Sequence, residues 1–395
     1  MRRGVVAAAG NAQGESAGPD QPPSAPVRRV RFALLDGVRF LAAVMVVSYH
    51  FTAFGQGAWG ARASSVFPQS AELTKYGAYG AQLFFVISGF VILLTAWGKR
   101  REDFVASRIA RLFPAYWVSV ALTAVLSLVI WKGRTSVTWN DAITNLTMVQ
   151  TAFGAPHVDG VYWTLWVELR FYVLVLVLMS IGLTRKRLLV VVAAWPVLAA
   201  LSAGSESLLL ETLLMPEAAP FFAGGIAISM IHKFGHDVLT WLLLGANVIF
   251  AMRSHLPFLR AIERGTGLPT SSTVAHLVVA SFFLIVALVV LTPLVRVQWK
   301  ALTTLGMLTY PLYLIHEFWG WYIISRVREH ADEYVALAAA VGVTAFVAWL
   351  IMRFVETPLA PGLRRAVLRS LAQDDDGRPV GRKFATTSQD GSGTP

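Results

Sequence analysis

The sequence predicts an all-α fold: a polytopic membrane helix bundle of about ten transmembrane helices with the N- and C-termini in the cytoplasm. Three observations predict it. The chain of 395 residues is 55% hydrophobic and only 14% charged, which is too apolar for an ordinary soluble domain. Apolar runs long enough to cross a bilayer recur along it. Lys and Arg gather in the loops on the side of the N-terminus, as the positive-inside rule requires.

The expected spans follow one another with short connections. They cover about residues 34–55, 78–98, 113–131, 162–182, 188–203, 206–231, 237–252, 274–297, 303–324 and 334–354. The region 188–231 is the least regular, because charged residues and a proline interrupt it at Glu206, Glu211, Pro216 and Glu217.

Composition also predicts the domain boundaries. Residues 1–32 are rich in Gly, Ala, Pro and Ser and are expected to form a disordered cytoplasmic tail. Residues 33–360 form the membrane domain, and residues 361–395 form a basic and then disordered cytoplasmic tail. The protein is therefore expected to be a multi-pass protein of the cell membrane, with the lipid bilayer as its surroundings.

Several kinds of chemistry are excluded. The chain has no Cys, so disulfides, thiolate catalysis and sulfur-ligated metals are ruled out, and the spacing of the remaining polar residues predicts no metal site. The net charge of +11 follows from the positive-inside distribution, so no nucleic-acid partner is expected. Gly-rich phosphate loops, nucleophile elbows and zinc-protease motifs do not occur.

The first span carries three polar residues that hydrocarbon disfavours: Asp36, Arg39 and His50. Eleven residues separate Arg39 from His50, and eleven helical steps end only about 20° past three full turns. The two side chains therefore share one helix face, with His50 roughly 16 Å deeper. Asp36 lies one turn before Arg39 and is expected to pair with it.

The second span contains Ser88-Gly89, which is small enough to let another helix approach closely, so helix packing is expected there. Arg108 and Arg111 follow, three residues apart, on a short helical turn before Pro114. These arginines have two readings that the residues alone leave open. They are either anchors at the lipid headgroups or a fork for a phosphorylated ligand, because guanidinium pairs phosphate oxygens.

The fourth span places Glu168 in the membrane, one turn from Tyr172. An intramembrane carboxylate indicates function by default, and pairing with a structural partner such as Arg39 is the alternative. The long outer loop before this span, about residues 132–161, holds Asp141, His157 and Asp159 without a metal-ligand spacing.

The ninth span carries a second polar stripe, because Tyr313, His316 and Glu317 fall on one face at i, i+3 and i+4. A scaffold role and a substrate contact are both open for this stripe. Pro311 is expected to kink this span.

The last span and the remaining histidines give more local predictions. Pro358 is expected to stop the last helix, and Glu356 is expected to pair with a nearby arginine. His236, His255 and His276 fall in or beside loops and are expected to be solvated.

A set of motifs in a fixed order resembles a known family. The chain carries Leu35-Asp36-Gly37-Val38-Arg39 with Tyr49-His50, then Phe84-Phe85-Val86-Ile87-Ser88-Gly89-Phe90, Arg108-x-x-Arg111 with Pro114-Tyr116-Trp117 (residue 115 lying between), Trp163-Thr164-Leu165-Trp166-Val167-Glu168 through Phe171-Tyr172, Tyr310-Pro311-Leu312-Tyr313-Leu314-Ile315-His316, and Glu356-Thr357-Pro358. Over about residues 33–360, this set resembles the integral-membrane acyltransferase 3 family. Thr164 stands where the family usually has Ser, and it keeps the hydroxyl.

The resemblance implies an O-acyltransferase that moves a short acyl group from acyl-CoA to a hydroxyl on a sugar or glycosylated molecule. It implies no permanently bound cofactor, with acetyl-CoA or propionyl-CoA as co-substrate. His50 matches the essential histidine of the family and Arg39 the arginine of the same motif. Arg108 and Arg111 match the cytoplasmic arginine pair, which would hold the phosphates of coenzyme A.

The chemistry of the residues agrees with this resemblance. A sugar hydroxyl needs a base to take its proton, and imidazole suits this task near neutral pH. His50 does so directly or is acylated first and passes the group on; both routes stay open. Glu168 is expected to orient His50 or to balance Arg39, and further substrate contacts are expected from Asp36, Tyr313 and His316.

The acceptor can be of two kinds, and a function other than acyl transfer is also open. Without the extra soluble domain of many polysaccharide-modifying relatives, the chain resembles stand-alone members that acylate small glycosides, including macrolide sugars in antibiotic biosynthesis. The rival acceptor is a cell-envelope polysaccharide. A secondary transporter would also place Arg, His and Glu inside a bundle, although it gives no role to Arg108 and Arg111. The sequence does not set an oligomeric state.

Overall fold

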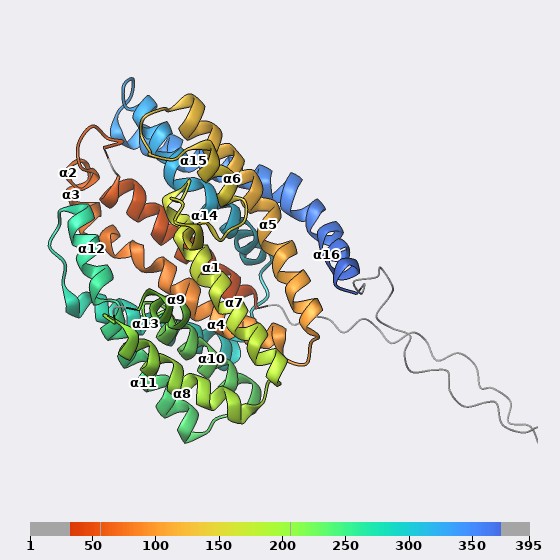
Figure 1. Cartoon of the computed structure of the whole chain (residues 1–395). Helices are drawn as coiled ribbons and strands as arrows, with labels where there is room; N and C mark the ends of the chain where they lie inside the picture. Colours follow the sequence, from red (N-terminus) through yellow and green to blue (C-terminus); the bar gives the residue numbers. More distant parts are fainter. Residues whose placement is uncertain (1–31, 56, 206, 373–395) are drawn as a thin grey trace, which may run out of the picture. The chain divides into compact units, whose positions relative to one another are not determined.

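The computed structural model describes residues 32–55, 57–205 and 207–372, and these residues form helices and no strands (Figure 1). The predicted disorder of residues 1–31 and 373–395 lies outside the described residues. Residues 361–371, assigned by the sequence to a cytoplasmic tail, are helical. The all-α polytopic bundle is confirmed.

Ten long helices correspond to the predicted spans. They are α1 (Ala33–Ser48), α4 (Gly80–Ala96), α5 (Arg101–Val125), α7 (Trp163–Ile181), α8 (Arg185–Ser202), α10 (Ala219–Phe234), α11 (Val238–Ser254), α13 (Ser272–Leu291), α14 (Lys300–Val327) and α15 (Glu333–Ile351). By length and apolarity, eight helical stretches of the described chain qualify as candidate membrane spans. The two others are α8, which opens on three basic residues, and α14, which carries the polar stripe.

Shorter helical elements connect and extend these spans. The α-helical ones are α2 (Ala63–Val66), α3 (Pro68–Thr74), α6 (Trp139–Asn145), α9 (Leu208–Leu214), α12 (Leu256–Thr266) and α16 (Thr357–Leu371). The 3₁₀ segments are η2 (Lys75–Tyr79), η4 (Gln150–Phe153), η5 (Gly160–Tyr162) and η6 (Pro293–Arg296), and the π-helical segments are η1 (Tyr49–Phe54), η3 (Leu126–Ile130) and η7 (Met352–Glu356). The interruption predicted within 206–231 is present, because Met215 adopts a left-handed conformation between α9 and α10.

Prolines interrupt the helices less than the sequence predicts. Helix α5 begins at Arg101 and runs through Pro114, so Arg108 and Arg111 lie on a long helix and not on a short turn before it. Helix α14 is helical across Pro311, and the predicted kink there stays a prediction. The prediction that Pro358 ends the last helix is wrong, because η7 leads directly into α16 and Pro358 lies in the first turn of α16.

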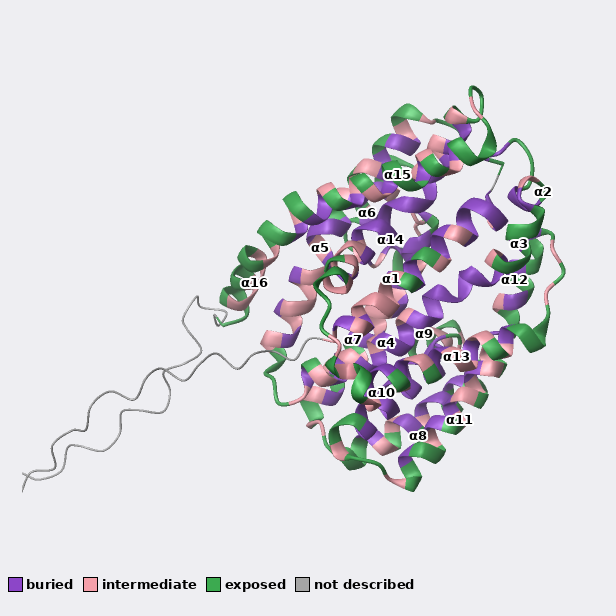
Figure 2. Cartoon of the chain, turned by 180° about the vertical axis from the view of Figure 1, so that it is seen from behind, coloured by how far each residue is buried: buried purple, intermediate pink, exposed green. Residues whose placement is uncertain are grey.

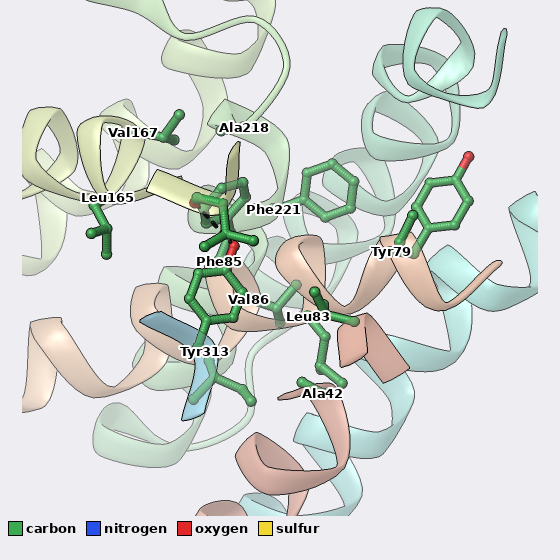
Figure 3. Packing of buried hydrophobic residues seen from close by; sticks show 14 of the residues in the cluster. Ala42, Tyr79, Leu83, Phe85, Val86, Leu165, Val167, Ala218, Phe221 and Tyr313 are labelled. Atoms are coloured by element: carbon green, nitrogen blue, oxygen red, sulfur yellow. Dashed lines mark hydrogen bonds between the residues drawn. The ribbon is translucent and has the colours of Figure 1, made fainter. Parts of the chain in front are cut away.

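Helices α1, α4, α10 and α14 form the centre of the bundle. Helix α14 packs against α1 and α15, and α4 packs against α10 and α1. Figure 2 shows buried residues concentrated on these central helices, whereas α8, α11 and α16 present many exposed ones. Figure 3 shows Ala42 of α1, Leu83 and Val86 of α4, and Phe221 of α10 among the residues of the buried core.

The crossing of α4 and α10 depends on two glycines. A Cβ atom at Gly89 would lie 2.2 Å from the backbone oxygen of Phe222, and one at Gly225 would lie 2.2 Å from the backbone oxygen of Val86. Both distances are far below van der Waals contact. The close approach predicted from Ser88-Gly89 is therefore confirmed.

Large apolar side chains cover the outside of the described bundle. Exposed examples on four different spans are Val177, Leu242, Leu284 and Phe346. Apolar side chains exposed on several successive spans are typical of a lipid-facing surface.

His255 differs from its sequence-based expectation. It is buried at the end of α11, and its Nδ1 atom lies 2.8 Å from the hydroxyl oxygen of Tyr79. The prediction of a solvated side chain is wrong for this histidine, because the short turn that carries it is covered by η2.

Candidate functional site

Two histidines from distant parts of the chain meet in the core. His50 lies in η1, the π-helical turn that continues α1, and His316 lies in α14. The Nδ1 atom of His50 is 2.9 Å from the Nε2 atom of His316. Both residues are buried. Single π-helical turns inside α-helices are frequent at functional sites.

The hydrogen bonds of this pair fix which nitrogen carries each proton. His316 Nδ1 lies 2.9 Å from the carbonyl oxygen of Tyr313 and 3.2 Å from that of Leu312. A carbonyl only accepts, so in the neutral pair we assign the proton of His316 to Nδ1. His316 Nε2 is then an acceptor, and His50 Nδ1 donates to it. This leaves the Nε2 atom of His50 with a free lone pair.

Glu317 faces this free nitrogen. Its Oε1 atom lies 3.7 Å from His50 Nε2, which is too long for a direct hydrogen bond. The Glu317 side chain is buried and packs on Gly160, where an added Cβ would lie 2.7 Å from Oε2 and 2.8 Å from Oε1. The polar stripe predicted on α14 therefore points into the core beside His50.

The junction of η5 and α7 holds this part of α14 in place. Asp159 is buried, and its carboxylate accepts the backbone N–H groups of Val161 and Phe318, both at 3.3 Å. The hydroxyl of Tyr162 donates to the carbonyl of Leu314 at 3.3 Å. Burial raises the pKa of Asp159 to about 6, so the carboxyl is mainly ionised at neutral pH.

Tyr313 belongs to the same junction. Its hydroxyl lies 2.9 Å from that of Thr164 and 3.3 Å from the carbonyl oxygen of Val161. The hydroxyl that Thr164 retains in the family motif therefore ties α7 to the helix that carries His316.

Aromatic rings pack around His50, and one of them also lines a cavity. The rings of Tyr49, Phe54 and Trp321 lie within 6.2 Å of its imidazole, centroid to centroid, and the indole N–H of Trp321 donates to the His50 carbonyl at 3.0 Å. Phe54 also lines a cavity of about 300 Å³, together with Arg62.

A second group of polar residues lies at the other end of α1. We call it the arginine cluster, and it consists of Asp36, Arg39, Arg108, Arg111 and Glu168. Arg39 pairs with Asp36 at 3.4 Å, which confirms the predicted pair. Arg39 also interacts electrostatically with Arg111, Glu168 and Tyr172. At 1.5 Å per residue, it lies roughly 16 Å along the helix from His50.

Glu168 belongs to this arginine cluster. It accepts a hydrogen bond from Ser88 at 3.2 Å and another from the hydroxyl of Tyr172. Of the two roles open for Glu168, the structure places it with Arg39, and its described hydrogen bonds do not reach His50.

Arg108 and Arg111 belong to the same cluster. Arg111 forms an ion pair with Glu356 and lies over the ring of Tyr310, which confirms that Glu356 pairs with an arginine. Arg108 lies between the rings of Phe104 and Tyr172. The two guanidinium groups are thus held by aromatic faces, a setting that arginine favours.

The predicted site residues fall into two groups. His50, His316 and Tyr313 meet in the core, and Arg39, Asp36, Glu168, Arg108 and Arg111 form the arginine cluster. Glu317 was predicted as part of the polar stripe, with a scaffold role and a substrate contact both open. Asp159 was named only as a loop residue, although Asp159 next to Gly160 before a span is a recognisable helix-start signal. Among the described residues, no group of three or more His, Asp and Glu side chains could hold a metal ion.

The sequence matches the profile of the acyltransferase domain family, the acyltransferase 3 family, over residues 32–353. The chain belongs to this family. The match covers α1 to α15 and so includes both the His50–His316 pair and the arginine cluster. No solved structure matches the chain.

Curated relatives match over shorter segments. The peptidoglycan O-acetyltransferase OatA of Listeria monocytogenes is 27% identical over 35% of this chain and 23% of its own. The acyltransferase MdmB of Streptomyces mycarofaciens is 27% identical over 37% of this chain and 39% of its own. Protein 2 in the picA locus of Rhizobium radiobacter is 34% identical over 26% and 48%. The chain therefore spans less than half the length of each of these relatives.

Proposed function

We propose that this protein is a membrane O-acyltransferase that moves a short acyl group from acyl-CoA to a sugar hydroxyl. The observation that carries the proposal is the buried His50–His316 pair, which leaves the lone pair of His50 Nε2 free. In the direct route, this nitrogen takes the hydroxyl proton while the hydroxyl oxygen attacks the thioester carbonyl. The coenzyme A thiolate leaves and receives the proton, so the products are an ester and a thiol.

His316 serves as the positioning residue of this pair. It holds the His50 ring through a hydrogen bond to Nδ1, and two backbone carbonyls fix its own tautomer. A base whose second nitrogen is oriented by another group is the arrangement that activates hydroxyl groups in many acyl-transfer enzymes.

The arginine cluster supports the donor side of the proposal. Arg39, Arg108 and Arg111 bring three guanidinium groups to one end of α1. Guanidinium pairs phosphate oxygens in two-point hydrogen bonds, and coenzyme A carries several phosphates. Acetyl-CoA or propionyl-CoA bound there would extend its thioester toward His50, with Glu168 balancing the charge of Arg39.

For the acceptor, we infer a small glycosylated natural product such as a macrolide, with a cell-envelope polysaccharide as the second candidate. The similarity to the acyltransferase MdmB supports an acyl-transfer reaction, and the similarity to the peptidoglycan O-acetyltransferase OatA makes peptidoglycan the example of the second candidate. A transporter, the rival of a different class, would leave the free base at His50 Nε2 without a reaction.

The test uses membranes that contain the protein and isotope-labelled acetyl-CoA or propionyl-CoA. Macrolides, methyl hexosides and peptidoglycan fragments are offered as acceptors, and mass spectrometry detects the ester. We expect a mass gain on a glycoside that His50→Ala abolishes and that His330→Ala, an exposed histidine after α14, leaves unchanged. Label on polymer alone would favour the polysaccharide, and no His50-dependent ester on any acceptor would contradict the proposal.

A further inference from the structure

Glu317 presents a second hydrogen-bond acceptor beside the free nitrogen of His50. Its Oε1 atom and His50 Nε2 lie 3.7 Å apart, and no hydrogen bond joins them. The side chain is 93% buried. A buried polar group of this kind is costly unless a ligand satisfies it.

The charge state of Glu317 follows from its neighbour. The carboxyl groups of Glu317 and Asp159 are in contact, and two ionised carboxylates this close in a buried site repel strongly. One proton between them converts the repulsion into a hydrogen bond. Asp159 accepts two backbone N–H groups and precedes the first turn of η5, so it keeps the charge.

The proton therefore resides on Glu317 and points toward Asp159. Both carboxyl oxygens of Glu317 pack against Gly160, and Oε1 is the one that lies 3.7 Å from His50 Nε2, so we assign the proton to Oε2. The site consequently offers two acceptors to a substrate, the imidazole nitrogen and the Oε1 atom, which lie 3.7 Å apart.

Two acceptors need two donors, and a single hydroxyl has only one hydrogen. Gauche hydroxyls on neighbouring carbons of a sugar ring have oxygens about one hydrogen-bond length apart. One of them can donate to His50 Nε2 while the other donates to Glu317 Oε1. An alcohol without the second hydroxyl would leave the buried Oε1 atom without a hydrogen-bond donor. An unpaired buried polar group costs binding energy, so such an alcohol would be strongly disfavoured as a substrate.

We propose that Glu317 binds a second acceptor hydroxyl on the carbon next to the one that is acylated, so that the protein selects sugars with a free vicinal diol. This inference rests on the proposed function. It makes Glu317 a specificity-determining residue, and it makes Asp159 and Gly160 positioning residues that hold the Glu317 carboxyl in place.

The experiment compares two acceptors in two backgrounds. The parent acceptor is the glycoside that the wild type acylates, and the second is its deoxy analogue without the hydroxyl next to the acylated position. For the wild type, we expect kcat/KM to be about 10- to 100-fold lower with the deoxy analogue. For Glu317→Met, which keeps the side-chain length without an acceptor, the two acceptors should differ by less than about 3-fold.

A second variant tests the same point without changing Glu317. Gly160→Ala places a methyl group against the Glu317 carboxyl, so it should also reduce the preference for the parent acceptor. Glu329→Met is the matched control, because Glu329 is exposed beyond α14, and it should keep the wild-type preference. Fluorescence-detected size exclusion confirms that each variant is folded and inserted.

The outcomes separate this inference from the proposed function. If Glu317→Met and Gly160→Ala acylate the parent acceptor with the same preference as the wild type, the diol contact is wrong and the acyltransferase stands. An ester on a hydroxyl without a free neighbour would overturn it in the same way. If the wild type transfers no acyl group to any acceptor, the proposed function fails and this inference fails with it.

Discussion

At the residue scale, the most consequential contact is the hydrogen bond between His50 and His316. The tautomer of His50 depends on His316, and the tautomer of His316 depends on backbone carbonyls that do not titrate over the physiological range. The backbone of α14 therefore determines the tautomer of His50 through two successive hydrogen bonds, one between the backbone and His316 and one between His316 and His50. Removing His316 would free the imidazole to rotate and to take the other tautomer.

His316→Phe should therefore lower kcat without a comparable change in KM. The substitution keeps a ring in the space and removes the acceptor for His50 Nδ1, so we expect kcat to fall about 10²- to 10⁴-fold. Steady-state kinetics on reconstituted protein measures both constants, with His330→Phe as the exposed control. A loss confined to KM would show that His316 binds substrate and does not position His50.

Asp159 gives a pH dependence of stability. Burial raises the pKa of Asp159 to about 6, whereas an exposed aspartate titrates near about 3.9. Between about pH 4 and 6, the folded protein holds a proton that the unfolded chain releases, so the free energy of unfolding falls as the pH rises. This part of the pH dependence should be absent in Asp159→Asn.

The measurement is the difference in melting temperature between the wild type and Asp159→Asn in detergent. The wild type should lose stability relative to the variant from about pH 4 to 6, by at most about 1.4 kcal/mol per pH unit, and the difference should level off above about pH 7. A difference that is the same at every pH would contradict the raised pKa.

The sequence predicted two kinds of residue contact: those between neighbours on one helix, and those that a charged residue in an apolar span requires. Asp36 and Arg39 are one helical turn apart, and Glu356 needed a cation inside an apolar span. It did not predict the pairing of Asp159 with Glu317. Asp159 precedes α7 and Glu317 lies in α14, so their contact depends on how two distant helices pack, and neither residue's neighbours in the sequence carry that information.

At the scale of elements, the crossing of α4 and α10 brings the backbones of two spans into close contact. Gly89 and Gly225 face each other across it, with backbone atoms where side chains would stand. In a bilayer, helices associate through close packing, since lipid is as apolar as the helices themselves. This crossing therefore fixes α4, which also packs against α1 and so supports the helix that leads to His50.

Gly89→Ala should destabilise the bundle by about 1–3 kcal/mol, because the added methyl forces the two backbones apart. Gly245→Ala is the matched control, since a Cβ at Gly245 in α11 meets nothing within 4 Å. It should be neutral or stabilising by up to about 1 kcal/mol. Thermal unfolding followed by size exclusion in detergent measures both, and equal melting temperatures would contradict the close approach.

The helices themselves could be read from apolar runs, because each span needs a length set by the bilayer. Their ends could not. The short turn expected before Pro114 and the stop expected at Pro358 both assumed that proline limits a helix, whereas α5 runs through Pro114 and α16 has Pro358 in its first turn. The π-helical turns at Tyr49–Phe54 and Met352–Glu356 have no sequence signal of their own.

At the scale of the whole described bundle, one helix links the two polar groups. Helix α1 carries Arg39 near its start and continues into the π-helical turn with His50. In the proposed reaction, acyl-CoA would bind at the arginine cluster, at one end of this helix. The sugar acceptor would bind near Phe54, at the other end, so the two substrates would approach His50 from opposite directions. The proposed reaction therefore depends on the orientation of the bundle in the membrane.

The orientation predicted from the basic loops can be tested directly, because the chain contains no Cys. Single cysteines at two exposed positions, Lys186→Cys in the first turn of α8 and Ser136→Cys between α5 and α6, report on which side of the membrane each position lies. With the N-terminus in the cytoplasm, a membrane-impermeant maleimide should label Ser136→Cys in intact cells. Lys186→Cys should react only after the cells are opened, and the reverse pattern would contradict the predicted topology.

Because the imidazole pair is neutral, membrane voltage exerts no net force on it. A full charge that crosses a bilayer changes in free energy by about 2.3 kcal/mol for each 100 mV, whereas an uncharged group experiences no such force. His50 and His316 are joined as two neutral rings, with their protons assigned by carbonyl oxygens. Their resting geometry is therefore the same in an energised cell and in a vesicle without any potential.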